Sequence, residues 1–170
     1  MVTIYTDGAA RGNPGPGGWG AIISCPRIVN SRQEEWVYEI GGGEKHTTNN
    51  RMELMGAIKA LEFVSKLEAR SYNLEAVVHT DSEYLMKGIT LWIKNWQAKG
   101  WKTASKKPVL NQDLWQELLT QTASRQIQWK YVAGHSGDRA NERCDIIATS
   151  FADQSPIELY DGPASAYKYL

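Results

Sequence analysis

The sequence VTIYTDGAARGNPGPGGWGAII, residues 2–23, contains two alternating stretches joined by glycines and prolines. Apolar and polar side chains alternate over residues 2–7, which is the period of a β-strand that buries one face. The glycines and prolines at 12–18 predict a turn. The alternation resumes at 19–24 and again at 35–40, and the glycine run at 41–43 is expected to end this third strand. These three stretches predict an antiparallel meander with short connections.

The rest of the chain alternates between helical and strand patterns. Helices are predicted over about 50–66, from Ser82 onward with Ser82 as a possible cap, over 113–123 and over 138–152. Strands are predicted over 74–80 and 127–131. This order predicts an α/β fold in which helices cover a mixed sheet. The last residues contain two prolines and have no clear period. We therefore expect one domain at 1–152 and a C-terminal tail at 153–170 whose role the pattern does not indicate.

The composition is that of an ordinary globular protein. Hydrophobic residues make up 42% of the 170 residues and charged residues 22%, which is enough for one sizeable core. No apolar run approaches the roughly 20 residues of a membrane helix, and the first residues lack the pattern of a secretory signal. Cys25 and Cys144 are the two cysteines. We expect a monomer in a reducing cytoplasm, with no membrane partner.

The formal net charge is zero, which argues mildly against a nucleic-acid-binding protein because such proteins are usually basic. The charge is unevenly distributed, however. Residues 94–107 contain five lysines and no acidic residue. Trp92, Trp96 and Trp101 lie within or beside this segment, which is typical of a phosphate-binding surface with aromatic platforms. A solvent-exposed lysine face over a small tryptophan core would give the same pattern.

Four acidic residues occupy positions where their carboxylates could meet. Asp7 and Asp81 end two predicted strands, and ligands bind beyond such strand ends in open α/β sheets. Glu53 lies in the first turn of its predicted helix, at the end of a stripe of small and apolar residues. Asp145 falls in the middle of the last predicted helix, where an acid would face the core or its edge.

Each acid also has an ordinary structural explanation. Asp7 before a glycine could be a turn residue, Asp81 could cap a helix, Asp145 could face solvent, and Asn50 with Glu53 fits a capping box. A cluster of carboxylates is nevertheless costly, because like charges raise one another's pKa values. Mg²⁺ removes this penalty because it prefers oxygen ligands, and two such ions support phosphodiester hydrolysis. The sequence contains no Ser-His-Asp, Cys-His or zinc-type arrangement that competes with this interpretation.

Five longer blocks follow one another along the chain. They are TDGAARGNPGPGGWGAII, TTNNRMELMGAIKAL, HTDSEYL, GITLWIKNWQAKGWKTASKKPV and VAGHSGDRANERCDIIA, and they cover roughly residues 3–150. In sequence and order these blocks resemble bacterial type 1 ribonuclease H. The resemblance implies a ribonuclease H-like α/β fold, in which a five-stranded mixed sheet of three antiparallel and then two parallel strands is flanked by helices.

The same resemblance implies a function. Members of this family are endonucleases that hydrolyse the RNA strand of RNA–DNA hybrids. The resemblance also implies a reaction that uses two Mg²⁺ ions, for which Mn²⁺ could substitute, and that leaves 5′-phosphate and 3′-hydroxyl ends. The expected partner of this chain is therefore an RNA–DNA hybrid.

Individual residues match functional positions of the family. Asp7, Glu53, Asp81 and Asp145 match the metal-binding and catalytic carboxylates. His135 matches a mobile catalytic histidine, and a loop histidine can relay a proton near neutral pH. The residues that match contacts to the hybrid are Asn13, Asn49 and Asn50 for the minor groove, Trp92, Trp96, Lys99, Lys102 and Lys106 for the DNA strand, and Thr48 and Asn111 for a DNA phosphate.

The sequence departs from the family pattern at a few positions. His46 stands where arginine is common in the phosphate pocket, so we expect a weaker and pH-sensitive contact there. Glu83 stands where a neutral glutamine is familiar, which predicts a weaker minor-groove contact. The segment around Trp96 has lost some basic residues.

Two other functions fit part of the same pattern. A DNA-strand transferase of the integrase type would share the fold but use a three-acid site, and the TTNNRME block and the tryptophan-rich segment disfavour it. A non-catalytic hybrid-binding module would bind without cleaving, and the presence of acids at all four positions disfavours it.

Overall fold

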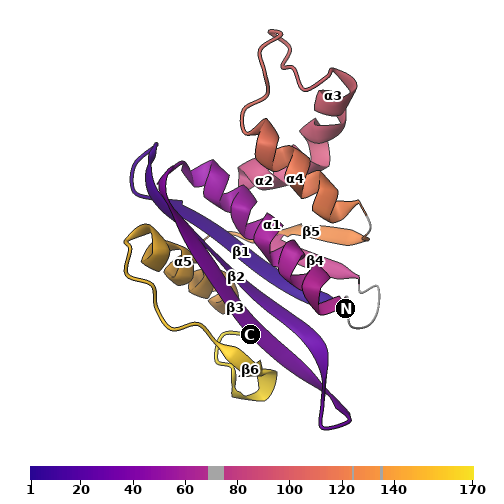
Figure 1. Ribbon diagram of the computed structural model, residues 1–170, viewed down its shortest axis with the longest axis vertical. Coiled ribbons are helices and arrows are strands. Elements are labelled where there is room, and N and C mark those ends of the chain that lie inside the picture. Colours follow the sequence, from indigo (N-terminus) through magenta and orange to yellow (C-terminus); the bar gives the residue numbers. More distant parts are fainter. Residues whose placement is uncertain (69–74, 124, 135) are drawn as a thin grey trace.

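The structure, a computed structural model, describes residues 1–68, 75–123, 125–134 and 136–170. Within these residues six strands form one mixed sheet, and helices cover both of its faces (Figure 1). The strands are β1 Val2–Ala10, β2 Gly15–Val29, β3 Arg32–Thr47, β4 Ala76–Thr80, β5 Ile127–Tyr131 and β6 Asp161–Pro163.

The strands lie in the order β5-β4-β1-β2-β3-β6. β1, β2 and β3 pair antiparallel, whereas β1 with β4 and β4 with β5 pair parallel. The prediction of three antiparallel strands followed by two parallel ones is therefore confirmed. The short β6 adds a sixth strand to the five that were expected, and it pairs antiparallel with the outer edge of β3.

The glycine run at 41–43 does not end the third strand, so that prediction was wrong. Gly41, Gly42 and Gly43 continue the ladder opposite Gly20, Trp19 and Gly18. The strand continues because the ladder is made by backbone groups, which glycine also carries. The long β2–β3 hairpin gives the sheet its length in Figure 1.

The helices agree with the predicted order, with small shifts at their ends. They are α1 Asn49–Glu68, α2 Glu83–Lys87, the π-helix η1 Gly88–Trp92, α3 Ile93–Ala98, α4 Gln112–Thr122, α5 Arg139–Ala152 and the 3₁₀ turn η2 Ala164–Ala166. Ser82 caps α2, as predicted, by accepting from the backbone of Leu85. Asn50 is not the cap of α1, because the helix already begins at Asn49 and Thr48 Oγ1 accepts from the backbone N–H of Arg51 at 3.4 Å.

Two apolar layers sandwich the sheet. α1 packs on one face, where Ile4, Leu54 and Ile58 belong to the larger core. α5 packs on the other face, where Ile22, Cys144 and other residues form a second cluster. Figure 1 shows α1 and α5 on opposite sides of the central strands. None of the helices in the described part of the chain has both the length and the apolar composition needed to cross a membrane.

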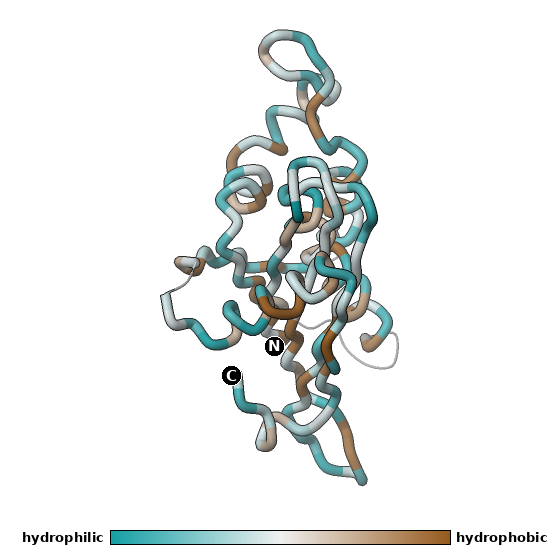
Figure 2. The backbone as a smooth tube through the Cα atoms, turned by 90° about the vertical axis from the view of Figure 1, so that its left-hand side faces the viewer, coloured by the Kyte–Doolittle hydropathy of each residue, from teal (hydrophilic) through white to brown (hydrophobic). Residues whose placement is uncertain are grey.

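The segment after α3 extends beyond the sheet. Figure 2, a side view, shows it as a mostly hydrophilic loop at the upper end of the molecule. At the opposite end, the tail after α5 returns along the sheet edge and forms β6 and η2. The tail therefore has defined structure, although its sequence has no period. Leu74, which was expected to begin the fourth strand, lies outside the described residues.

Candidate active site

Asp7 and Asp81 lie side by side because the strands that carry them are parallel neighbours. In the pairing of β1 with β4, Thr6 lies opposite Thr80. The residues that follow them, Asp7 and Asp81, therefore lie at the same edge of the sheet. Asp81 follows the last residue of β4 directly, whereas Asp7 lies within β1 rather than at its end, because β1 continues beyond it. The backbone N–H of Gly8 donates to Asp7 Oδ1 at 2.7 Å.

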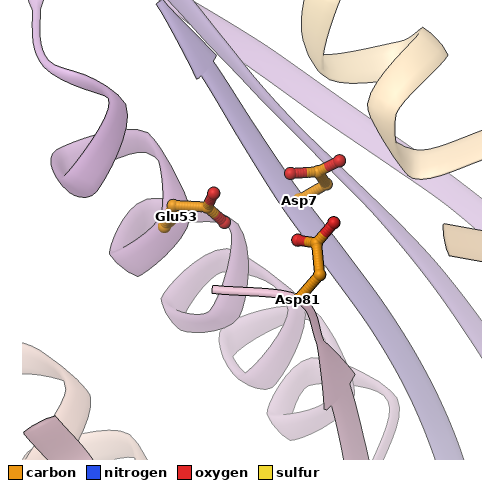
Figure 3. Close-up of side chains that lie close together, drawn as sticks. All are labelled: Asp7, Glu53 and Asp81. Carbon is orange, nitrogen blue, oxygen red and sulfur yellow. The ribbon is translucent and has the colours of Figure 1, made fainter. Parts of the chain in front are cut away.

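Glu53 reaches the same place from the first turns of α1. A Cβ at Gly8 would lie 2.3 Å from the backbone nitrogen of Glu53, so glycine at this position lets α1 approach β1 closely. Figure 3 shows the carboxylates of Asp7, Glu53 and Asp81 turned towards one another. Each supplies an oxygen that lies within 4.8 Å of the oxygens of the other two.

A pocket of about 310 Å³ surrounds this cluster. α5 contributes Asn141, Glu142 and Asp145 to its lining, so the fourth predicted acid lies at the pocket but outside the closest group of three. Asn141 is 3% exposed and its Nδ2 donates to Asp81 Oδ2 at 3.0 Å. Asn141 and Glu142 were not predicted from the sequence. The four-residue spacing of Asn141 and Asp145, which puts them on one helix face, is the signal that could have found the asparagine.

The carboxylates of the cluster are strongly perturbed. Burial, and then the charge of Asp81, raises the pKa of Asp7 to about 8. Burial, followed by the charges of Asp7 and Asp81, raises the pKa of Glu53 well above its usual value. Glu53 Oε2 is buried and, among the described residues, has no hydrogen-bond partner. Surplus negative charge, oxygen donors and an unpartnered buried oxygen together fit a hard divalent cation such as Mg²⁺.

Comparison with protein families gives a match to RNase H over residues 1–153, which is most of the chain. The chain belongs to the RNase H family. Proteins named Ribonuclease H from Cyanothece sp. (strain PCC 7425 / ATCC 29141) and Thermosynechococcus vestitus (strain NIES-2133 / IAM M-273 / BP-1) are 52% and 51% identical to it over 156 residues. The first match covers 92% of both chains, and the second covers 92% of this chain and 91% of its relative. The predicted bacterial type 1 ribonuclease H, and with it the prediction of an enzyme, is confirmed.

Solved structures of the RNase H family share the fold. LC9-RNase H1, a type 1 RNase H with the type 2 active-site motif, is 30% identical with a TM-score of 0.77, and the match covers 94% of this chain and 76% of that one. LC11-RNase H1, solved in complex with an RNA/DNA hybrid, is 24% identical with a TM-score of 0.65, covering 91% and 99%. The predicted ribonuclease H-like fold is therefore confirmed.

The asparagines predicted to contact the minor groove lie on two elements. Asn49 and Asn50 are the first residues of α1. Asn49 is exposed and also donates from Nδ2 to Glu53 Oε1 at 3.3 Å, so it lies at the border of the pocket. Asn13 is exposed in the turn between β1 and β2.

Thr48 and Asn111, the predicted phosphate-binding pair, are joined by a residue that the sequence did not single out. Arg51 donates its backbone N–H to Thr48 Oγ1 at 3.4 Å and its Nη1 to Asn111 Oδ1 at 3.4 Å. The start of α1 and the residue before α4 therefore meet at this arginine. His46 is exposed on β3, two residues before Thr48.

The tryptophan- and lysine-rich segment folds as exposed lysines over a small tryptophan core, and its binding of phosphates stays a prediction. The rings of Trp92 and Trp96 lie 5.6 Å apart, and Trp96 lies 5.5 Å from Trp115. Trp92 and Trp96 are half-buried, so they are part of a small aromatic core rather than free platforms. Above this core the lysines face solvent, and all five are exposed: Lys94, Lys99, Lys102, Lys106 and Lys107.

His135, the predicted catalytic histidine, lies outside the described residues. Its neighbour Gly134 is described, and a Cβ at that glycine would lie 2.9 Å from Asp81 Oδ2. The chain therefore passes beside the pocket immediately before position 135.

Proposed function

We propose that this member of the RNase H family hydrolyses the RNA strand of RNA–DNA hybrids at the pocket between β1, β4, α1 and α5. The observation that carries the proposal is the convergence of Asp7, Glu53 and Asp81, whose oxygens lie within 4.8 Å of one another. The substrate is supported by the relatives named Ribonuclease H and by the fold neighbour that was solved with an RNA/DNA hybrid.

The metal ions are part of this proposal. Asp7, Glu53 and Asp81 would hold the cations, and Asp145 lines the same pocket and would complete the ligand set for two of them. When bound, two divalent cations activate water and stabilise the leaving oxygen in phosphodiester cleavage. We propose Mg²⁺ as the ion, with Mn²⁺ as a substitute, because carboxylate oxygens suit both.

The protein's own residues position the strands. Asn49 and Asn50 stand beside Glu53, and asparagines can bind minor-groove edges and the 2′-hydroxyl that distinguishes RNA from DNA. Thr48 and Asn111 would hold a phosphate of the DNA strand. The exposed lysines of residues 94–107 would neutralise further phosphates.

The expected product follows from the bond that breaks. Water attacks phosphorus and the bond to the 3′-oxygen breaks, which leaves a 3′-hydroxyl on one fragment and a 5′-phosphate on the other. His135 is proposed to move a proton during this step or to assist product release. We further propose that the protein acts as a monomer in the cytoplasm.

A substrate panel tests the proposal. RNA–DNA hybrid, duplex DNA and duplex RNA, each labelled on one strand, would be incubated with the protein and either Mg²⁺ or a chelator. We expect cleavage of the RNA strand of the hybrid alone, in the presence of Mg²⁺, with 5′-phosphate ends. Cleavage or joining of DNA would favour a strand transferase, and hybrid binding without cleavage in Mg²⁺ would favour a binding module.

A further inference from the structure

The C-terminal tail returns along α5 and contacts it at several points. After α5 ends, the backbone N–H of Ile157 donates to Ser150 Oγ at 3.4 Å. Farther on, Arg143 Nη2 donates to the carbonyl of Glu158 at 3.2 Å, and Arg139 Nη2 donates to the carbonyl of Lys168. The tail therefore runs from the end of α5 back to its beginning, along the edge of β3 (Figure 1).

Glu39 of β3 is the point where sheet, helix and tail meet. Its side chain is 0% exposed, and its two oxygens accept from Arg143 Nε at 2.7 Å and Nη2 at 2.8 Å. The hydroxyl of Tyr167 donates to Glu39 Oε1 at 2.6 Å, and the backbone N–H of Tyr160 donates to Oε2 at 3.0 Å. The buried carboxylate is thus satisfied by one helix residue and two tail residues. A buried ion pair of this kind is costly to break, because the remaining charge is left without a partner.

The arginines that the tail contacts alternate along α5 with the residues that line the pocket. Arg139 and Arg143 are four residues apart and share one side of the helix. Asn141 and Asp145 are also four residues apart and line the pocket. Asn141 in addition donates to Asp81. Any rotation or shift of the first turns of α5 would move both sets together, because both lie on the same hydrogen-bonded helix.

We propose that Glu39, Arg143 and Tyr167 form a positioning group through which the C-terminal tail holds the first turns of α5, and so sets the place of Asn141 and Asp145 in the pocket. This inference rests on the proposed function, since the cation site gives those two positions their importance. It assigns a role in the reaction to a tail that lies largely beyond the RNase H match at residues 1–153.

A substitution in the tail tests this role without touching the pocket. Tyr167→Phe keeps the ring and removes only the hydroxyl that donates to Glu39. Tyr169→Phe is the matched control, because it removes a hydroxyl from the same tail and keeps the ring that lies against Tyr167 and Arg143. Glu39→Gln is a second variant, and it removes the negative charge to which Arg143 and Tyr167 donate. Each full-length protein would be studied for Mg²⁺ affinity by calorimetry without substrate, for kcat and KM on a hybrid, and for Tm.

For Tyr167→Phe we expect weaker Mg²⁺ binding and a kcat about 3- to 30-fold lower, with KM within about twofold, because sub-ångström to ångström displacements at a reacting centre cost up to roughly 100-fold. Tyr169→Phe should behave as the parent.

A lower Tm with unchanged Mg²⁺ affinity and kcat, measured well below Tm, would overturn the proposal and leave the tail a purely structural role. If Glu39→Gln does not fold, Tyr167→Phe decides alone. A parent that neither binds Mg²⁺ nor cuts the hybrid would refute the proposed function itself, and the two failures are therefore distinguishable.

Discussion

The environment of Asp7 shows most clearly how burial and neighbouring charges act on the carboxylates of the site. Asp7 is buried, it lies beside two other carboxylates, and its pKa is raised to about 8 from an ordinary value of 3.8. Burial is the larger cause and the charge of Asp81 the next. In the absence of a cation, this carboxyl therefore keeps its proton in the folded protein at pH values where it loses it in the unfolded chain.

The sign of the resulting pH dependence can be stated. Between about pH 4 and 8 the folded state binds the proton and the unfolded state does not, so cation-free stability should fall as pH rises, by at most about 1.4 kcal/mol per pH unit for this group. Asp7→Asn should remove this part of the dependence. The free energy of unfolding of the variant should therefore rise relative to that of the parent between about pH 5 and pH 8. Urea unfolding in chelator measures this difference, and a constant difference across the range would contradict the assigned environment. Saturating Mg²⁺ should flatten the parent's curve.

His135 has a testable role although its placement lies outside the described residues. A proton relay typically contributes about 10²- to 10⁴-fold, whereas the proposed metal ions would carry most of the charge stabilisation. His135→Ala should therefore lower kcat without matching the loss caused by removing Asp7. The pH profile of kcat for parent and variant tests this, and coincident profiles would exclude a catalytic histidine.

At the scale of elements, the alternating pattern predicted the strands, and the residues after the strands predicted where the carboxylates meet. The meeting of Asp7 and Asp81 follows from parallel neighbouring strands, because both residues come at the same edge. The glycines at 41–43 were misread because strand pairing there depends on the partner strand and not on local preference. Asn141 was missed because its only sequence signal is its four-residue spacing from Asp145, and the structure is needed to show that it donates to Asp81.

The lysine-rich segment carries a prediction about binding. If Lys99, Lys102 and Lys106 neutralise hybrid phosphates, their replacement by alanine should raise KM and flatten its dependence on salt, since each contact contributes roughly 0.9 to the log–log slope for B-form DNA. Turnover at saturating hybrid should change less, because these lysines do not line the pocket.

A charge-matched variant separates this effect from the change in net charge. Arg32, Lys59 and Lys66 lie on β3 and on the later turns of α1, and their replacement by alanine removes the same charge elsewhere. KM measured against salt should change for the first triple variant and not for the second. Parallel curves with equal KM for the first variant and the parent would make the lysines an ordinary solvated face.

At the scale of the whole molecule, function depends on how separate parts are combined. The net charge of zero argued mildly against nucleic-acid binding, but five exposed lysines lie on one projecting segment, whereas Asp7, Glu53 and Asp81 converge in the pocket. The tail could not be placed from sequence because its strand has only three residues, and its main anchor, Glu39, lies more than 100 positions earlier in the chain. Contacts between residues so far apart produce no periodic pattern in the local sequence.

The separation of binding from chemistry gives the most direct test of the central claim, that the carboxylate pocket cuts the RNA strand. Asp7→Asn and Asp81→Asn keep side-chain shape and remove one negative ligand each, and Asp161→Asn makes the same change in β6, away from the pocket. The measurement is hybrid binding and RNA-strand cleavage in Mg²⁺ on the same preparations. The first two variants should bind the hybrid with an affinity near that of the parent and lose cleavage, whereas Asp161→Asn should retain both. Cleavage at a near-parental rate by Asp7→Asn and Asp81→Asn, with Mg²⁺ as the sole metal, would contradict the account.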